Sequence, residues 1–293
     1  MFVLTGSQQF GLLSGITQSL AGRVGLIHLL PFAASELSSA RQLPESLEEL
    51  LVRGLYPPLY DRDILPGDLF SGYIATYVEL DARQLINVRD LSAFQRFVKM
   101  CAARTGQILN LSSLASDCGI THNTAASWIS VMEASYLIYL LRQHHRNFNK
   151  RLIKAPKLYF FDVGLAAWLL GIHTPEQIRF HAQRGAIFET FVVTEFLKGR
   201  LNQGLPSKLF YWRDSKGLEI DLILEAGDRL NAIEIKSGQT IAPDFFSSLK
   251  IWGKLAGQAD LPSWLIYGGG KALTNENISI VPWKNLSQIN GDK

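Results

Sequence analysis

Two carboxylates and a lysine stand in two short apolar segments whose composition is typical of neighbouring β-strands. The segments are Glu219–Leu224 and Ala232–Lys236, and a glycine-containing turn separates them. Side chains alternate between the faces of a strand, so Asp221 projects from one face of the first segment, while Glu234 and Lys236 share a face of the second. If the two strands are adjacent, the three polar side chains meet on one side of the sheet.

These three side chains have the chemistry of a divalent-metal site. Two carboxylates held close together repel each other unless a cation lies between them. Mg2+ prefers carboxylate oxygens and water as ligands, so Asp221 and Glu234 are its predicted ligands. The ammonium group of Lys236 could then orient a metal-bound water as a nucleophile. The alternative is an ordinary ion pair between Glu234 and Lys236 on a solvated face of the sheet.

Asp221 followed by Glu234-Ile235-Lys236 resembles the D…ExK signature of the restriction-endonuclease-like nucleases. In that family the acidic pair holds a metal ion, and the lysine assists the attack of water on a phosphodiester. A preceding helix often supplies a further acid, and Glu189 within Phe188–Val193 matches that role. The resemblance implies an α/β nuclease domain with Glu189, Asp221, Glu234 and Lys236 as catalytic residues and Mg2+ as cofactor. Many members of the superfamily keep the fold without cutting, so a non-catalytic binding module is the alternative.

A domain spanning residues 156–293 would position these side chains. Its helices are predicted at Asp162–Leu170, Gly185–Leu197 and Pro243–Leu255. Besides the two segments above, its strands are predicted at Lys157–Phe161, at Leu209–Trp212 and at Trp264–Tyr267, which is expected to be the final strand.

Residues 106–155 have the pattern of a winged helix-turn-helix. Helices are predicted at Leu111–Cys118 and His122–Leu137, with Thr121 as the N-cap of the second, and a strand follows at Tyr136–Leu141. Proteins of this kind place their second helix in the major groove of DNA, so DNA is the predicted partner.

The predicted DNA-contacting residues fall into a neutral set and a basic set. The neutral set at the start of the second helix is Thr121, His122, Asn123, Thr124 and Ser127. Phosphate contacts supply most of the affinity for DNA, so these residues alone predict weak binding. The basic set is Arg142, Arg146, Lys150, Arg151, Lys154 and Lys157, which could form a phosphate-binding track. The alternative is a solvated basic face beside a helix pair that contacts protein.

The N-terminal third of the chain has two patterns. Residues 1–35 hold two continuous apolar runs that are typical of buried parallel strands, yet a piece of this size cannot bury itself. Residues 36–105 are predicted to be mostly helical, and Leu43–Gly54 is amphipathic. The acidic residues expected on the solvent side of that helix are Glu45, Glu48 and Glu49.

Several stretches along the chain carry a second resemblance: Thr5-Gly6-Ser7, Arg23, Tyr159–Leu165, Arg184-Gly185, Phe188-Glu189 and Glu234–Gly238. Together they make the chain similar to prokaryotic AAA-type ATPases that carry a C-terminal domain with a restriction-endonuclease-like core. The resemblance implies that residues 1–35 are a remnant of the ATPase core, that residues 36–105 form its helical lid, and that other AAA-type subunits are partners.

The chain departs from that family at the phosphate-binding loop. No G-x-x-x-x-G-K-[ST] sequence is present, and Gly268–Lys271 lacks the required spacing. Binding of ATP needs backbone amides, a lysine and a Mg2+-binding hydroxyl together. We therefore expect no ATP site and no ATP hydrolysis in this chain, and an N-terminally truncated member of the family.

Composition is compatible with several globular domains. The chain has 293 residues, of which 47% are hydrophobic and 19% charged, and a net charge of +3 permits a nucleic-acid partner without requiring one. Cys101 and Cys118 have no metal or redox spacing, which favours a reduced, cytoplasmic setting. No apolar run has the length of a membrane span, so no membrane partner is expected. The predicted fold class is multi-domain, with α/β and α+β parts.

Overall fold

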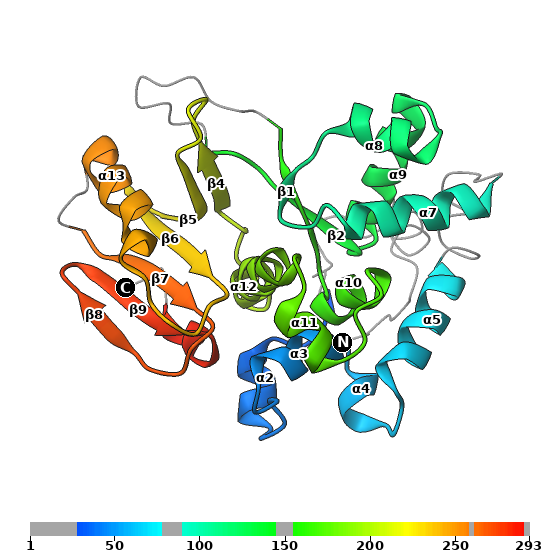
Figure 1. Ribbon diagram of the computed structural model, residues 1–293, viewed down its shortest axis with the longest axis horizontal. Coiled ribbons are helices and arrows are strands. Elements are labelled where there is room, and N and C mark those ends of the chain that lie inside the picture. Colours follow the sequence, from blue (N-terminus) through cyan, green and yellow to red (C-terminus); the bar gives the residue numbers. More distant parts are fainter. Residues whose placement is uncertain (1–27, 78–89, 145–154, 258–260, 290–293) are drawn as a thin grey trace, which may run out of the picture.

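The computed structural model describes residues 28–77, 90–144, 155–257 and 261–289 (Figure 1). Within these ranges the chain is a mixed α/β protein, built from helices and two β-sheets. The predictions for residues 1–27, including Arg23, and for Arg146, Lys150 and Arg151 lie outside the described residues. No helix in the described ranges is long and apolar enough to cross a membrane.

The first part of the chain folds into helices and a small antiparallel sheet. Its helices include α2 (Ala34–Ser39), α3 (Leu47–Arg53), α4 (Pro58–Asp61), α5 (Pro66–Thr76), α7 (Leu91–Ala102), α8 (Leu111–Cys118) and α9 (His122–Ala134). The strands β1 (Gln107–Ile108), β2 (Ile138–Leu141) and β3 (Lys157–Phe160) form a sheet in the order β1-β3-β2. The side chains of Asn110 and Thr121 cap α8 and α9, and Gly119 ends α8 with a φ of 68°.

Two predicted boundaries differ from the structure in this region. The helix predicted to reach Leu137 ends at Ala134, because Tyr136 has a φ of 54° and a helix cannot continue through that conformation. The strand predicted to open the C-terminal domain is β3, which pairs with both β1 and β2. All four residues of β3 are buried, so it is the central strand of the small sheet.

The second part of the chain contains a larger mixed sheet. Its helices include α10 (Val163–Leu169), α11 (Pro175–Phe180), α12 (Arg184–Leu201), η2 (Pro243–Phe246), α13 (Ser247–Ala256) and η3 (Trp283–Gln288). Its strands are β4 (Leu209–Arg213), β5 (Glu219–Ala226), β6 (Arg229–Lys236), β7 (Ser263–Tyr267), β8 (Leu273–Asn275) and β9 (Ile278–Pro282), in the order β4-β5-β6-β7-β9-β8. β4, β5 and β6 are antiparallel to one another, and β6, β7 and β9 are parallel.

Helices cover both faces of this sheet. Phe191 of α12 belongs to one apolar cluster with Leu222 and Ile233 of the sheet. Trp252 of α13 belongs to a different cluster with Trp212, and their ring centroids are 5.1 Å apart. In Figure 1, α12 lies between the six-stranded sheet and the small sheet, in contact with β6 and β3. This helix therefore joins the two sheets.

The prediction that Trp264–Tyr267 is the final strand was wrong. β7 covers that segment, and β9 pairs beside it in parallel, with Leu265 aligned to Ile280. β8 is short and largely exposed, so it has little strand signal, whereas Ile278–Val281 of β9 has the β-branched composition of a strand and was overlooked. Pairing of β9 with β7, and of β8 with β9, satisfies the backbone groups of both strands at this edge of the sheet.

The contact between α3 and α10 depends on an aspartate and two glycines. The Asp162 carboxylate accepts a hydrogen bond from the Leu165 N–H at 2.7 Å, which caps α10, and another from the Leu55 N–H at 2.6 Å. A Cβ atom added at Gly164 would lie 2.5 Å from the Cα atom of Gly54. The two backbones are therefore in direct contact, and part of the Tyr159–Leu165 stretch has a packing role.

Candidate active site

The two predicted metal ligands lie opposite each other on adjacent strands. β5 and β6 are paired as predicted, and their register aligns Leu222 with Ile233, which puts Asp221 opposite Glu234. Beyond that pair, the Ile235 N–H donates to the Asp221 carboxylate at 2.8 Å instead of to a backbone carbonyl. The Asp221 carboxylate thus takes the place of a backbone acceptor where the pairing of β5 with β6 ends. This hydrogen bond holds Asp221 beside Glu234–Lys236.

Glu234 and Lys236 form an ion pair, but it is not on a solvated face. The Lys236 ammonium donates to Glu234 Oε1 at 2.5 Å. Glu234 is only 5% exposed, and its Oε2 atom is buried without a hydrogen-bond partner in the structure. Burial, and then the Asp221 carboxylate, raise the pKa of Glu234 to about 8, although Lys236 opposes the shift. Glu234 therefore has one oxygen atom without a hydrogen bond, and burial disfavours its negative charge.

Glu189 comes from α12 and approaches the same group of charges. Its Oε1 atom accepts hydrogen bonds from the Lys157 ammonium at 2.8 Å and from the Tyr159 hydroxyl at 2.6 Å. Burial raises the pKa of Glu189 to about 7, with Lys157 opposing the shift and Asp221 adding to it. Burial also raises the pKa of Asp221, against the lysines on either side. The structure therefore brings Glu189, Asp221, Glu234 and Lys236 into one electrostatic environment.

Sequence reasoning missed a second cation in this site. Lys157 was predicted to belong to a surface phosphate-binding track, but it is 3% exposed and forms ion pairs with Glu189 and Glu219. Arg213 also pairs with Glu219, at 3.1 Å. Burial lowers the pKa of Lys157, but the surrounding carboxylates outweigh this effect, and the net shift is upward. The sequence pattern that could have revealed this lysine is the alternation along β3, which puts Lys157 and Tyr159 on one face of a buried strand.

The segment after Lys236 is fixed by contacts from three other elements. The Arg184 guanidinium donates to the Ser237 carbonyl at 2.6 Å and to Glu48 at 2.8 Å. The Gly268 N–H donates to the Lys236 carbonyl, and a Cβ atom at Gly268 would lie 2.4 Å from the Ser237 oxygen. Glu48 was expected on the solvent side of its helix, but it is 3% exposed because it is the counter-ion of Arg184.

The carboxylates fit a divalent ion bound by two protein ligands. Mg2+ is commonly held by one or two carboxylates together with water and substrate phosphates. Asp221 and Glu234 supply that number, and the buried Oε2 atom of Glu234 has no competing hydrogen bond. Within the described ranges, no group of three or more His, Cys, Asp or Glu side chains is placed to hold a metal ion. Glu189 is instead engaged by Lys157 and Tyr159.

The predicted DNA-contacting residues lie away from this site. Thr121, His122 and Asn123 are exposed at the start of α9, whereas Thr124 is half-buried and bonded to Thr121 at 2.8 Å. In Figure 1, α8 and α9 lie on the opposite side of α12 from the six-stranded sheet.

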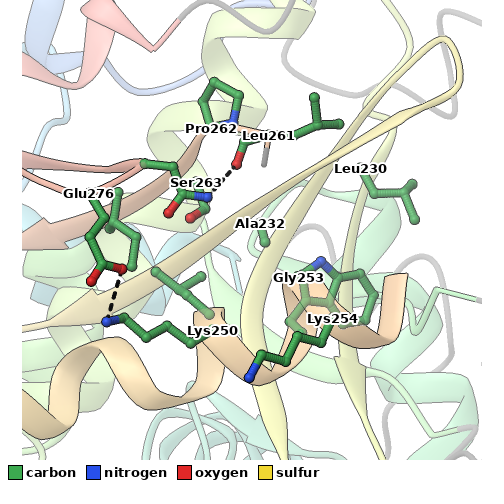
Figure 2. Close-up of a pocket in the computed structure, with 13 residues that line it drawn as sticks. Leu230, Ala232, Lys250, Gly253, Lys254, Leu261, Pro262, Ser263 and Glu276 are labelled. Carbon is green, nitrogen blue, oxygen red and sulfur yellow. Dashed lines mark hydrogen bonds and ion pairs between the residues drawn. The ribbon is translucent and has the colours of Figure 1, made fainter. Parts of the chain in front are cut away.

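Two hollows on the described surface do not coincide with the candidate site. The smaller has a volume of about 280 Å3 and lies beside α13 (Figure 2), where Lys250 pairs with Glu276 at 3.0 Å. The larger, of about 720 Å3, lies between α2, α12 and η3. None of the four predicted catalytic side chains lines either hollow. The candidate site is therefore identified by its charges and geometry and not by a deep cavity.

Two family models match separate segments of the chain, and the second segment begins at the first residue of α12. Residues 44–176 match a domain of unknown function (DUF8612), and residues 184–286 match another domain of unknown function (DUF4143). Uncharacterized proteins of Mycobacterium bovis and Mycobacterium tuberculosis are each 29% identical over 251 residues, which is 85% of this chain and 54% of theirs. The chain thus spans about half the length of these curated relatives. No solved structure matches it with significance.

Proposed function

We propose that the chain is a DNA-binding, Mg2+-dependent phosphodiester hydrolase. The observation that carries the proposal is the pairing of Asp221 with Glu234 across β5 and β6, with the Lys236 ammonium beside them. The order α12, β4, β5, β6, α13, β7 is the one expected for a restriction-endonuclease-like core. The order α8, α9, β2 matches the two helices and the strand predicted for the winged helix-turn-helix, which supports the DNA-binding part of the proposal.

Each site residue has a distinct role in this proposal. Asp221 and the free oxygen of Glu234 would hold the ion, which would supply positive charge beside the scissile phosphate and lower the pKa of water. Lys236 is 33% exposed at its side chain, so its ammonium can reach both Glu234 and a water molecule in the open part of the site. Lys236 would orient that water, and Glu189 would contribute negative charge from α12.

Plasmid nicking tests this function directly. The full chain is incubated with supercoiled DNA and Mg2+, and parallel samples contain EDTA. Nicking is expected with Mg2+ alone, and Lys236→Ala is expected to abolish it. Lys250→Ala is the matched control, because Lys250 is a surface lysine that pairs with Glu276 on the outer side of the sheet. Absence of metal-dependent nicking, or nicking that survives Lys236→Ala, would contradict the proposal.

A non-catalytic binding module is the second candidate. The observation that favours it is the engagement of Glu189 by Lys157 and Tyr159, which neutralises part of the site without a metal ion. Binding of DNA would then survive Lys236→Ala and fall steeply as salt is raised, because phosphate contacts release counterions. Electrophoretic mobility shift at two salt concentrations measures that binding, and the plasmid-nicking assay separates this candidate from the nuclease, since a binding module does not nick.

We also propose that the chain is the C-terminal part of an AAA-type ATPase-family protein, without an ATP site of its own. The support for it is the resemblance of the short stretches named above, together with curated relatives about twice as long. Other AAA-type subunits are partners in this proposal. Equilibrium dialysis with labelled ATP tests the missing ATP site, since saturable binding to this chain would contradict it.

A further inference from the structure

The charges of the candidate site are arranged on two sides. On one side, Lys236 pairs with Glu234. On the other, the Lys157 ammonium lies between two carboxylates, Glu189 at 2.8 Å and Glu219 in direct contact. The Asp221 carboxylate accepts the Ile235 N–H at 2.8 Å, and its charge raises the pKa of both Lys157 and Lys236. The site thus holds four carboxylates and a separate lysine for each side.

The position of Lys157 has the features of a cation site. Its nitrogen atom contacts one oxygen of Glu189 and one of Glu219, and it lies 5.6 Å from the centre of the Tyr211 ring, which is a favourable location for positive charge. Carboxylate oxygens bind divalent ions at roughly 2.0–2.6 Å, so the Glu189 oxygen, which lies 2.8 Å from the ammonium nitrogen, would move inward to hold one. A divalent ion could replace the ammonium with small movements of the two carboxylates.

The lysine and its partners come from different parts of the chain. Lys157 lies on β3 of the small sheet, within residues 44–176, whereas Glu189 and Glu219 lie within residues 184–286. Tyr159, two residues along the same strand, binds the same oxygen of Glu189. The small sheet therefore supplies the cation that neutralises carboxylates of the second matched segment.

We propose that Lys157 is a built-in cation that takes the place of a second metal ion between Glu189 and Glu219. The site then binds one divalent ion, at Asp221 and Glu234, and loss of the Lys157 charge opens a second divalent-cation site at Glu189 and Glu219. This inference rests on the proposed function for the first ion only. The second site is defined by the ammonium contacts themselves.

Counting bound Mn2+ tests the inference. The full chain is titrated with Mn2+, and the free ion is followed by electron paramagnetic resonance. We expect one ion per chain for the wild type and for Lys157→Arg, which keeps the charge, and two for Lys157→Met and Lys157→Gln. Adding Glu219→Gln to Lys157→Met removes a ligand and is expected to return the count to one.

Lys198→Met is the matched control. Lys198 is also a fully buried lysine that pairs with a glutamate, Glu195, at 2.5 Å, but it lies three residues from that glutamate on α12. Lys198 also donates to the Phe32 carbonyl, and Asp162, a second carboxylate that acts on it, is already engaged by the Leu55 and Leu165 N–H groups. We therefore expect the count to remain one. Mn2+ is also expected to raise the melting temperature of Lys157→Met more than that of the wild type or Lys198→Met, because binding to the folded state alone stabilises it.

Each outcome decides between the inference and the proposed function. One bound Mn2+ ion per chain in both the wild type and Lys157→Met overturns the inference and leaves the proposed function standing. Two bound ions in the wild type also overturn the inference and leave the proposed function standing. A count of zero for the wild type and one for Lys157→Met supports the inference and contradicts the metal-dependent function. A count of zero for both overturns both. If Lys157→Met and Lys157→Gln fold only with Mn2+, the inference is supported; if neither folds even with Mn2+, it is overturned.

Discussion

Replacing Glu234 with Gln is expected to stabilise the metal-free protein at alkaline pH. The pKa of Glu234 is raised from the ordinary value of 4.5 to about 8, chiefly by burial. Between these two pH values the folded state binds more protons at this residue than the unfolded state does, so the free energy of unfolding falls as pH rises. Below the lower value the carboxyl group is neutral in both states, and it makes no difference to stability.

The magnitude follows from the size of that shift. A rise from 4.5 to about 8 corresponds to roughly 5 kcal/mol, at about 1.36 kcal/mol for each unit of pKa. This is an upper bound, because the Lys236 side chain is 33% exposed and water reaches the pair. We expect about 2 kcal/mol of the loss to be recovered by Glu234→Gln at pH 9, since a neutral amide has no charge to desolvate. At pH 4 the variant should gain nothing.

Urea denaturation in EDTA measures this effect at both pH values. Glu276→Gln is the control, because Glu276 is an exposed carboxylate on the far side of the sheet from α12, paired with Lys250 at the surface. The control is expected to show the pH dependence of the wild type. A Glu234→Gln protein that is less stable than the wild type at pH 9 would refute the reasoning, since the charged carboxylate would then be stabilising the fold.

Three further predictions concern the framework around the site. Gly164→Ala is expected to lower the free energy of unfolding by about 1–3 kcal/mol or more, because its Cβ atom would overlap the backbone of Gly54; an unchanged urea midpoint would contradict the contact. Asp162→Ala leaves two buried N–H groups without their acceptor, and a loss of about 3 kcal/mol is expected by the same measurement, with Asp162→Asn losing less. Arg184→Met leaves the buried carboxylate of Glu48 without its counter-ion, so the free energy of unfolding from thermal denaturation is expected to fall by about 3–5 kcal/mol. Arg184→Lys keeps the charge and should recover part of this loss. Equal losses for the two variants would show that the charge of residue 184 does not stabilise the fold.

Local patterns in the sequence were sufficient to predict the β5–β6 hairpin that carries the candidate site. Alternation along two short strands predicted that Asp221, Glu234 and Lys236 share a side, and the observed register puts the first opposite the second. The N-cap at Thr121 was also evident, and its side chain accepts the Thr124 N–H at 3.1 Å. These features depend on residues close together in the chain, where strand periodicity and capping chemistry act directly.

Other features depend on partners that are distant in the sequence. Lys157 and Glu48 were placed at the surface because both are charged, yet each is buried against an opposite charge from another element. The strand β8 has a weak pattern of its own and forms beside β9, which in turn pairs with β7. A charged residue is buried only when the fold supplies its counter-ion, and that partner cannot be identified from a local pattern. The sequence by itself therefore determined that Asp221, Glu234 and Lys236 would meet on adjacent strands, while the tertiary structure decided that a second lysine, Lys157, is buried among these charges.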